Sequence, residues 1–276
     1  MLVPYGYKLK ILEMKRMVFV LALLCMGGVA LPQSGKLMPV TTSSKLALEL
    51  YNEAIKHYDA VNTSRAIEAF DAALSEDPDF FMANYQLAMF YLMNESPDNF
   101  RRYSYAAVNC KAKLSEAEEL LQEAIARLRS GSEDATDIGR KLVDMYPGDP
   151  DAYNCLISFL SVTGETEDMV ETIKKALTVT RNAAPFYNQL GYAYLNLKQE
   201  DKAKEAFDRY IQLDPKNPNV YDSKGDYFMY TKQYDKAYEL YMKAHSMDPS
   251  FSEEKARMAQ QLYEQEKGRR LQVIPM

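Results

Sequence analysis

The sequence predicts an all-α fold: a right-handed superhelical solenoid of stacked antiparallel helix pairs that ends in a capping helix. The main observation is an internal repeat, because residues 198–203 (KQEDKA) fall on residues 232–237 (KQYDKA) when the chain is shifted by 34 positions. Pro215 and Pro249 keep the same spacing. A repeat of this length is typical of helix pairs that stack, since one pair alone cannot bury its own apolar face.

Each repeat carries a fixed pattern of aromatic, small and proline residues, and this pattern resembles the tetratricopeptide repeat family. The family pattern is W-x2-L-G-x2-Y, followed by an alanine, an aromatic residue and a closing proline. One copy matches at Tyr187, Leu190, Gly191, Tyr194, Ala203, Phe207 and Pro215, and the next at Tyr221, Gly225, Phe228, Ala237, Tyr241, Ala244 and Pro249. A third lies near the start, at Ala54, Ala66, Phe70, Ala73 and Pro78. With the weaker copies between them, the resemblance covers about three quarters of the chain and points to an exported, bacterial-type member.

The boundaries of the repeats follow from this pattern. We predict six repeats, with one extra residue between the second and the third, at residues 47–80, 81–114, 116–149, 150–183, 184–217 and 218–251. A capping helix is expected at 252–268, because the end of a stack needs a helix with a polar outer face. Residues 269–276 are predicted to be a disordered tail.

Proline and serine residues indicate where helices end and begin. Proline disfavours the α conformation of the residue before it and cannot continue the hydrogen-bond ladder, so we expect the second helix of a pair to end at Pro78, Pro147, Pro215 and Pro249. A serine followed three residues later by a glutamate forms a capping box, which predicts helix starts at Ser115 and at Ser250.

Small residues recur where the two helices of a pair must approach closely. A glycine within a helix costs about 1 kcal/mol relative to alanine, so it usually has a packing reason. Gly191 and Gly225 are therefore expected at such close approaches, with aromatic side chains filling the space that remains.

The first 30 residues read as a secretory signal peptide. Basic residues between Lys8 and Arg16 precede an apolar stretch at 17–31, and Gly28-Val29-Ala30 offers small residues for cleavage. The stretch is shorter than the roughly 20 residues that a spanning helix needs, so a membrane anchor is the weaker alternative. A lipid anchor at Cys25 is disfavoured because leucine precedes it.

Two further predictions concern the beginning of the chain. Met14 and Met17 are alternative start residues, because the signal would otherwise begin unusually late. Residues 31–44 are polar, contain Pro39 and have no apolar period, which predicts a flexible linker without structure.

Composition and motifs argue against several functions. The net charge is −6 and no block of basic residues occurs, so nucleic acid binding has little electrostatic support. The sequence has no glycine-rich phosphate loop and no metal-ligand spacing, which predicts no enzyme activity, no cofactor and no metal site. His57 and His245 fall in the first and last repeats. Cys110 and Cys155 fall in different repeats, and we expect both thiols to be free.

The candidate binding residues follow from the resemblance. In this family the first helices of successive pairs line a concave groove, and the resemblance implies that the groove is faced by Tyr51, Tyr58, Tyr85, Met89, Asn154, Ser158, Asn188, Tyr192, Asn196, Asp222, Asp226 and Tyr230. The N-terminal half of this set is rich in tyrosine and methionine, which suits an adaptable apolar contact. The C-terminal half offers amides and two carboxylates, which suit backbone amides or basic side chains. The alternative is that these residues only pack between helix pairs.

The function predicted from these observations is an exported scaffold or adaptor, periplasmic or secreted, that binds a protein or peptide along its groove. None of the groove residues is lysine or arginine, which argues against the carboxylate clamp by which relatives grip heat-shock proteins. Two alternatives remain open. The protein could assemble with itself in the cell envelope, or a small-molecule or catalytic site could lie between repeats.

Overall fold

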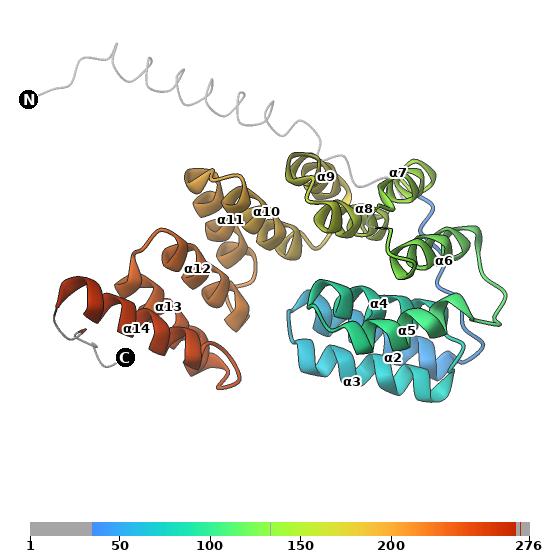
Figure 1. Ribbon diagram of the computed structural model, residues 1–276, viewed down its shortest axis with the longest axis horizontal. Coiled ribbons are helices and arrows are strands. Elements are labelled where there is room, and N and C mark those ends of the chain that lie inside the picture. The colour runs from blue at the N-terminus through green and yellow to red at the C-terminus, as the bar shows by residue number, and fades with distance from the viewer. Residues whose placement is uncertain (1–34, 133, 269–270, 272–276) are drawn as a thin grey trace, which may run out of the picture. The chain divides into compact units, whose positions relative to one another are not determined.

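The structure, a computed structural model, describes residues 35–132, 134–268 and 271 of the chain (Figure 1). Residues from Gly35 onward belong to one compact unit. The described residues form thirteen helices and no strand. The predicted signal peptide, with Cys25 and the alternative starts, lies outside the described residues, as does most of the predicted tail at 269–276.

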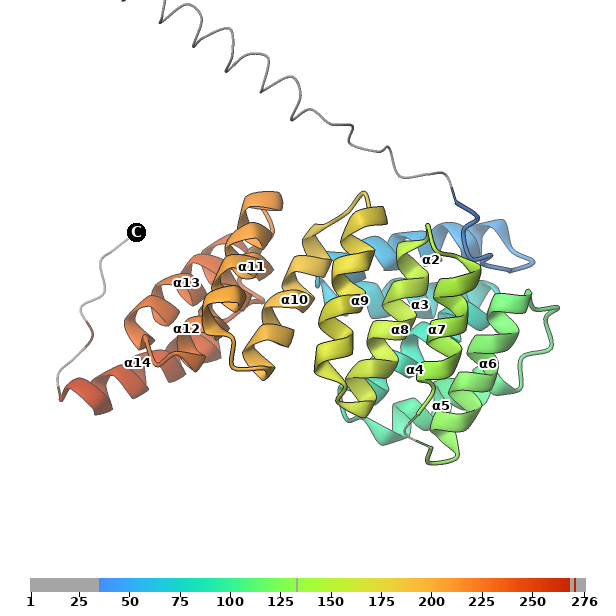
Figure 2. The ribbon, with the colours of Figure 1, turned by 90° about the horizontal axis from the view of Figure 1, so that it is seen from above.

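The helices follow one another in pairs. In chain order they are α2 (Lys45–Asp59), α3 (Thr63–Glu76), α4 (Phe81–Met93), α5 (Pro97–Val108), α6 (Glu116–Arg129), α7 (Thr136–Met145), α8 (Pro150–Thr163), α9 (Thr166–Val179), α10 (Ala184–Asn196), α11 (Glu200–Leu213), α12 (Pro218–Tyr230), α13 (Tyr234–Met247) and α14 (Glu253–Lys267). Neighbouring helices pack against each other, most extensively within α2–α3, α4–α5, α10–α11 and α12–α13 (Figure 2). The predicted all-α stack of helix pairs is confirmed.

The helix ends agree with the proline prediction. Helices α3, α7, α11 and α13 end two residues before Pro78, Pro147, Pro215 and Pro249. At Ser115 the capping box is complete, since its hydroxyl accepts from the backbone of Glu118 and the Glu118 side chain accepts from the backbone of Ser115. These signals are local, so they can be recognised from the sequence alone.

The capping box predicted at Ser250 is wrong. Helix α14 begins at Glu253, and its N-cap is Ser252 in the left-handed conformation, without a side-chain cap. The backbone and hydroxyl of Ser250 instead donate to Asp248 Oδ1, at 2.9 and 2.7 Å. The turn that follows α13 therefore competes for the serine that would otherwise start the helix.

The close approaches predicted at two glycines are present. A Cβ at Gly191 would lie 2.6 Å from the ring of Phe207, and a Cβ at Gly225 would lie 2.5 Å from the ring of Tyr241. A third close approach was not predicted. Gly139 of α7 comes so near to α8 that a Cβ there would lie 2.8 Å from Leu156 Cα.

The third predicted repeat departs from a simple helix pair. Helix α7 packs more extensively against α8 than against its predicted partner α6. The extra residue expected near Ser115 falls in a non-helical connection that runs from Asn109 to Ser115. This connection interrupts the regular period, and α6 packs against α5 and α4 instead.

The prediction of a flexible linker is wrong for residues 35–44. These residues form no helix, but several of them hydrogen-bond to side chains of the first three repeats. Met38 and Val40 also pack against the buried core of those repeats. We call residues 35–44 the N-terminal strap.

Two hydrogen bonds join the end of α2 to later repeats. The side-chain amide of Asn182, which follows α9, donates to Asp59 Oδ2 at 3.2 Å. The amide of Asn217, which precedes α12, donates to the backbone oxygen of Ala60 at 3.2 Å. They hold α2 beside repeats that are more than 100 residues away in the chain. None of the described helices is both long enough and apolar enough to cross a membrane.

Candidate functional site

A cavity of about 370 Å³ lies between the first helices of the repeats. Its walls come from α2, α4, α6, α8 and the start of α10, together with residues 38–40 of the N-terminal strap. Seven of the predicted groove residues line it: Tyr51, Tyr58, Tyr85, Met89, Asn154, Ser158 and Asn188. We call this space the strap cavity.

Buried aromatic side chains form the floor of the strap cavity. Tyr51 and Tyr85 are only 5% and 2% exposed. The Tyr51 ring packs on Phe70 and Phe80, with centroids 5.6 and 5.1 Å apart. Burial raises the pKa of both phenols, so they stay neutral at physiological pH.

Four buried polar atoms of the strap cavity lack a hydrogen-bond partner. They are Tyr85 Oη, Asn154 Oδ1, Asn188 Oδ1 and Gln189 Oε1, and all four residues line the cavity. In the part of the chain that the structure describes, no other buried side-chain oxygen or nitrogen is without a partner. A buried polar group without a partner costs about 1 to 3 kcal/mol, so their gathering in one cavity indicates a place for a ligand or for bound water.

Two carboxylates stand at the strap cavity without a basic partner. Asp59 ends α2 and Asp151 lies in the first turn of α8. Asp151 is solvent-exposed, but the protein around it displaces part of the water, and this desolvation together with the charges of Asp149 and Asp59 raises its pKa to about 6. Desolvation raises the pKa of Asp59 as well, although the amide of Asn182 opposes this effect. No lysine or arginine of the described residues lines the cavity.

The N-terminal strap is held by carboxylates of the repeats. Glu118 is fully buried and accepts from the backbone nitrogen of Thr41 at 2.8 Å and from its hydroxyl at 2.8 and 2.9 Å. Asp149 Oδ2 accepts from the backbone nitrogen of Met38 at 2.6 Å. The surface next to the strap cavity thus binds a segment without helix or strand through its backbone N–H groups.

The two predicted carboxylates near the C-terminus are already occupied. Asp222 accepts from the Lys255 ammonium at 2.7 Å and from the hydroxyl of Ser252. Asp226 accepts from Lys255 Nζ at 2.9 Å and from the hydroxyls of Tyr192 and Tyr241, each at 2.7 Å. Asp222, Asp226 and Tyr192 thus already have partners within the chain, and α14 supplies the basic group. We call this set of contacts the Lys255 site.

Asn196 and Tyr230, the last two predicted groove residues, are solvent-exposed and do not line the strap cavity. Gln189 was not predicted, since it lies outside the positions that the repeat pattern assigns to the groove. The only sequence signal for Gln189 was that its neighbour Asn188 occupies a predicted groove position.

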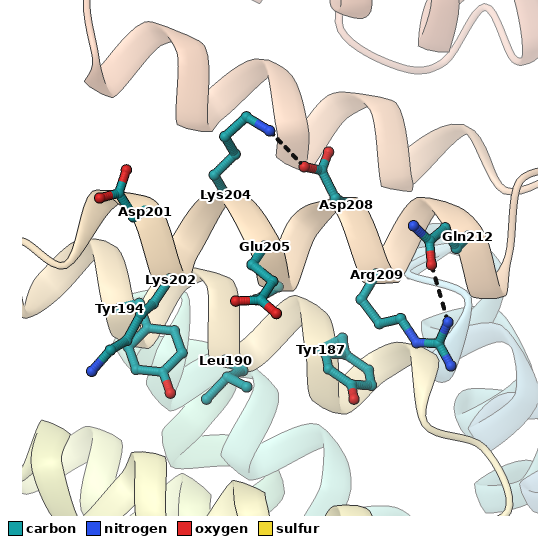
Figure 3. A pocket seen from close by; sticks show the side chains of 11 residues that line it. Tyr187, Leu190, Tyr194, Asp201, Lys202, Lys204, Glu205, Asp208, Arg209 and Gln212 are labelled. Carbon is teal, nitrogen blue, oxygen red and sulfur yellow. Dashed lines mark hydrogen bonds and ion pairs between the residues drawn. The ribbon is translucent and has the colours of Figure 1, made fainter. Parts of the chain in front are cut away.

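A second and more open hollow of about 840 Å³ lies beside α10 and α11 (Figure 3). Its charged groups are paired or face solvent, as in the contact of 2.8 Å between Lys204 Nζ and Asp208 Oδ2. Arg209 likewise donates to the side-chain oxygen of Gln212 at 3.0 Å. Although this hollow is larger, its lining has no buried polar atom without a partner, and it is the weaker candidate.

Cys110 and Cys155 are free thiols, as predicted. Cys155 lines the strap cavity, and burial raises its pKa to about 12, so the thiol stays protonated and is a poor nucleophile. Neither His57 nor His245 lines the cavity. Among the described residues, no group of three or more histidine, cysteine, aspartate or glutamate side chains is arranged to hold a metal ion.

Three stretches of the chain match models of a known family. Residues 184–217 and 218–251 match one tetratricopeptide repeat model, and residues 51–113 match a second. The first two ranges coincide with the fifth and sixth repeats of the sequence analysis. The chain is a tetratricopeptide repeat protein, a family of interaction scaffolds that are typically not catalytic.

The chain is also similar to solved structures, two of which are described as tetratricopeptide repeat proteins. TTC0263, a thermophilic tetratricopeptide repeat protein of Thermus thermophilus, is 19% identical with a TM-score of 0.47, over 79% of this chain and 98% of that one. YrrB, a tetratricopeptide repeat protein described as having an unusual peptide-binding site, is 17% identical with a TM-score of 0.37, over 78% and 92%. MamA is 19% identical with a TM-score of 0.36, over 74% and 96%. No curated protein matches the sequence.

Proposed function

We propose that this protein is an exported scaffold or adaptor that binds an extended segment of a protein partner in the strap cavity. The observation that carries the proposal is the set of four buried polar atoms without partners, which come from α4, α8 and α10 and meet in one cavity. Side chains from three helices converge there, and a bound segment would satisfy groups that otherwise destabilise the fold.

The way the protein holds its own N-terminal strap supports this proposal. The backbone N–H groups of Met38 and Thr41 donate to carboxylates of the repeats. Met38, Pro39 and Val40 also form one wall of the cavity. A partner segment in the strap cavity would lie beside a non-helical segment that is already bound through its backbone.

Export is the second part of the proposal. It rests on the order of basic, apolar and small residues before Leu31. Cleavage after Ala30 would leave residues 31–34 ahead of Gly35, where the strap begins. N-terminal sequencing of the protein from cells should yield a terminus close to Leu31, and an intact Met1 or Met17 terminus in the cytosol would contradict export.

A small molecule is the alternative occupant. A volume of about 370 Å³ lies within the range of roughly 300 to 1,000 Å³ that is usual for small-ligand sites. A metabolite screen by thermal shift distinguishes the two possibilities: a single compound that saturates the site and blocks peptide binding would favour the alternative.

The direct test is selection of peptides on the purified protein from a random display library. Selected peptides should lose at least tenfold in affinity on the Asn154→Ala/Asn188→Ala double variant. The control is Lys204→Ala/Glu205→Ala, at two exposed positions of α11, which should bind the peptides like the parent. If no peptide is selected, or if the control loses binding and the cavity variant does not, the proposed site is wrong.

A further inference from the structure

We propose that the strap cavity receives one basic side chain, an arginine or a lysine, from the partner segment. This inference rests on the proposed function and adds the chemical class of the residue that is recognised. Its three parts are the hydrogen-bonding character of the cavity, its charge, and a second site in the same chain that already holds a lysine.

Most of the atoms without partners in the strap cavity can only accept hydrogen bonds, so a ligand must supply the donors. Asn154 Oδ1, Asn188 Oδ1 and Gln189 Oε1 are acceptors, and only Tyr85 Oη is able to donate. An arginine side chain offers five N–H donors and a lysine offers three, and neither has an acceptor. A carboxylate, which only accepts, would leave the three amide oxygens unpaired.

The charge of the strap cavity points to the same class of ligand. Three acidic residues line it: Asp59, Glu118 and Asp151. The Glu118 carboxylate is saturated by Thr41 and Ser115, so Asp59 and Asp151 remain for a ligand. None of the lining residues that the structure describes carries a positive charge to balance them. A bound guanidinium or ammonium group supplies the missing charge.

The floor of the cavity suits the stem of a basic side chain. Ile55 and Met89 line the same space as Tyr51 and Tyr85. Lysine and arginine lay their methylene stems along apolar surface of this kind, and a cation is attracted to the face of an aromatic ring.

The Lys255 site shows the same chemistry with its cation in place. Two carboxylates, Asp222 and Asp226, hold the Lys255 ammonium, with the ring of Tyr241 5.6 Å away. The strap cavity brings together the same kinds of group, two carboxylates and several tyrosines. In the described residues, no lysine of the chain reaches it.

The test compares two short capped peptides that differ in one group. The probes are acetyl-Ala-Ala-Arg-Ala-Ala-amide and the same peptide with citrulline, whose neutral urea replaces the guanidinium at nearly equal size. Side-chain amide signals of Asn154, Asn188 and Gln189 are followed by NMR during titration of the protein. We expect the arginine peptide to shift these signals and to bind at least fivefold more tightly than the citrulline peptide.

Matched variants separate charge from shape. Asp59→Asn/Asp151→Asn should reduce arginine-peptide affinity at least fivefold. The control Asp98→Asn/Asp235→Asn removes the same charge from exposed positions outside the cavity and should change affinity less than twofold. An equal loss in the control would reduce the effect to long-range attraction and overturn the inference.

Further binding results also test whether the cavity recognises a basic side chain of a partner. Equal binding of the arginine and citrulline peptides, or tighter binding of a glutamate peptide, overturns the inference. Free arginine or spermidine that binds as tightly as the peptide overturns it too, because the site would then serve a small cation. If display selection yields cavity-binding peptides without basic residues, the proposed function stands and this inference alone fails. If the selection yields no cavity-binding peptide at all, the proposed function is wrong, and the inference that rests on it is wrong with it.

Discussion

The strap cavity and the Lys255 site contain similar groups and differ in whether a cation is present. Both place two aspartates among tyrosines of neighbouring helices. At the C-terminal end, Lys255 of α14 neutralises Asp222 and Asp226. At the N-terminal end, Asp59 and Asp151 lack such a partner among the described residues. Residue type at a groove position therefore does not tell whether that position is open to a partner.

The element that covers each region explains the difference. The last repeat is covered by a helix, and a helix presents long side chains such as Lys255 to its neighbour. The first repeats are covered by the N-terminal strap, which provides backbone and hydroxyl donors to Glu118, Asp149 and Asp77. The strap supplies no basic group to Asp59 or Asp151 and no donor to the amide oxygens of the cavity.

The largest effect is expected when the packing beneath the Lys255 site is disrupted. Gly225→Leu places a side chain where a Cβ alone would lie 2.5 Å from the Tyr241 ring, so Tyr241 must move away from Asp226. Overpacking of this kind costs about 3 kcal/mol, measured as the free energy of unfolding in urea. Glu205→Leu, on an exposed position of α11, serves as the control and should change stability by about 0.5 kcal/mol or less.

The next prediction removes the cation from the Lys255 site. Lys255→Met keeps the stem but leaves Asp222, which is 8% exposed, and Asp226 without a positive partner. Breaking a fully buried ion pair costs about 3 to 5 kcal/mol, and the partial exposure of Lys255 lowers our expectation to about 2 kcal/mol. Adding Asp222→Asn/Asp226→Asn should recover part of the loss in thermal melts. If stability does not recover, the unpaired charges of Asp222 and Asp226 are not the cause of the loss.

A smaller effect is expected at the strap. Thr41→Val keeps the shape of the side chain and removes its hydrogen bonds of 2.8 and 2.9 Å to the buried Glu118 carboxylate. The expected loss is about 1 kcal/mol, with faster amide exchange in residues 38–43. Thr178→Val, at an exposed position of α9, is the control. Equal exchange in parent and variant would show that the hydrogen bonds do not hold the strap.

The smallest effect concerns pH. The pKa of Asp151 is raised from 3.8 to about 6, so the folded state binds the proton more tightly than the unfolded chain. Stability therefore falls as pH rises through this range, and the full penalty is present above the folded pKa. Asp151→Asn removes the penalty, so its melting temperature should exceed that of the parent at pH 7.5 and approach it at pH 4. A constant difference at all pH values would contradict the raised pKa.

The repeats and part of the cavity lining could be predicted because they follow a period. Gly191, Gly225 and the closing prolines recur at fixed spacing, and the family resemblance carried by this pattern implied groove positions for Tyr51, Tyr85 and Asn188. Features outside the period could not be found in this way. Lys255 belongs to the cap, so no repeat position predicted its pairing with Asp222. The strap has no apolar period, and the buried carboxylate that holds it lies 77 residues further along the chain.

One measurement tests the comparison most directly: the affinity of the arginine peptide for Asn188→Lys. This change gives the strap cavity a lysine of its own, as Lys255 does at the other end. We predict at least a tenfold loss of peptide affinity with no loss of stability. The control Asn196→Lys, on the same helix but exposed and outside the cavity, should bind like the parent. Unchanged binding in Asn188→Lys, or an equal loss in the control, would contradict the account.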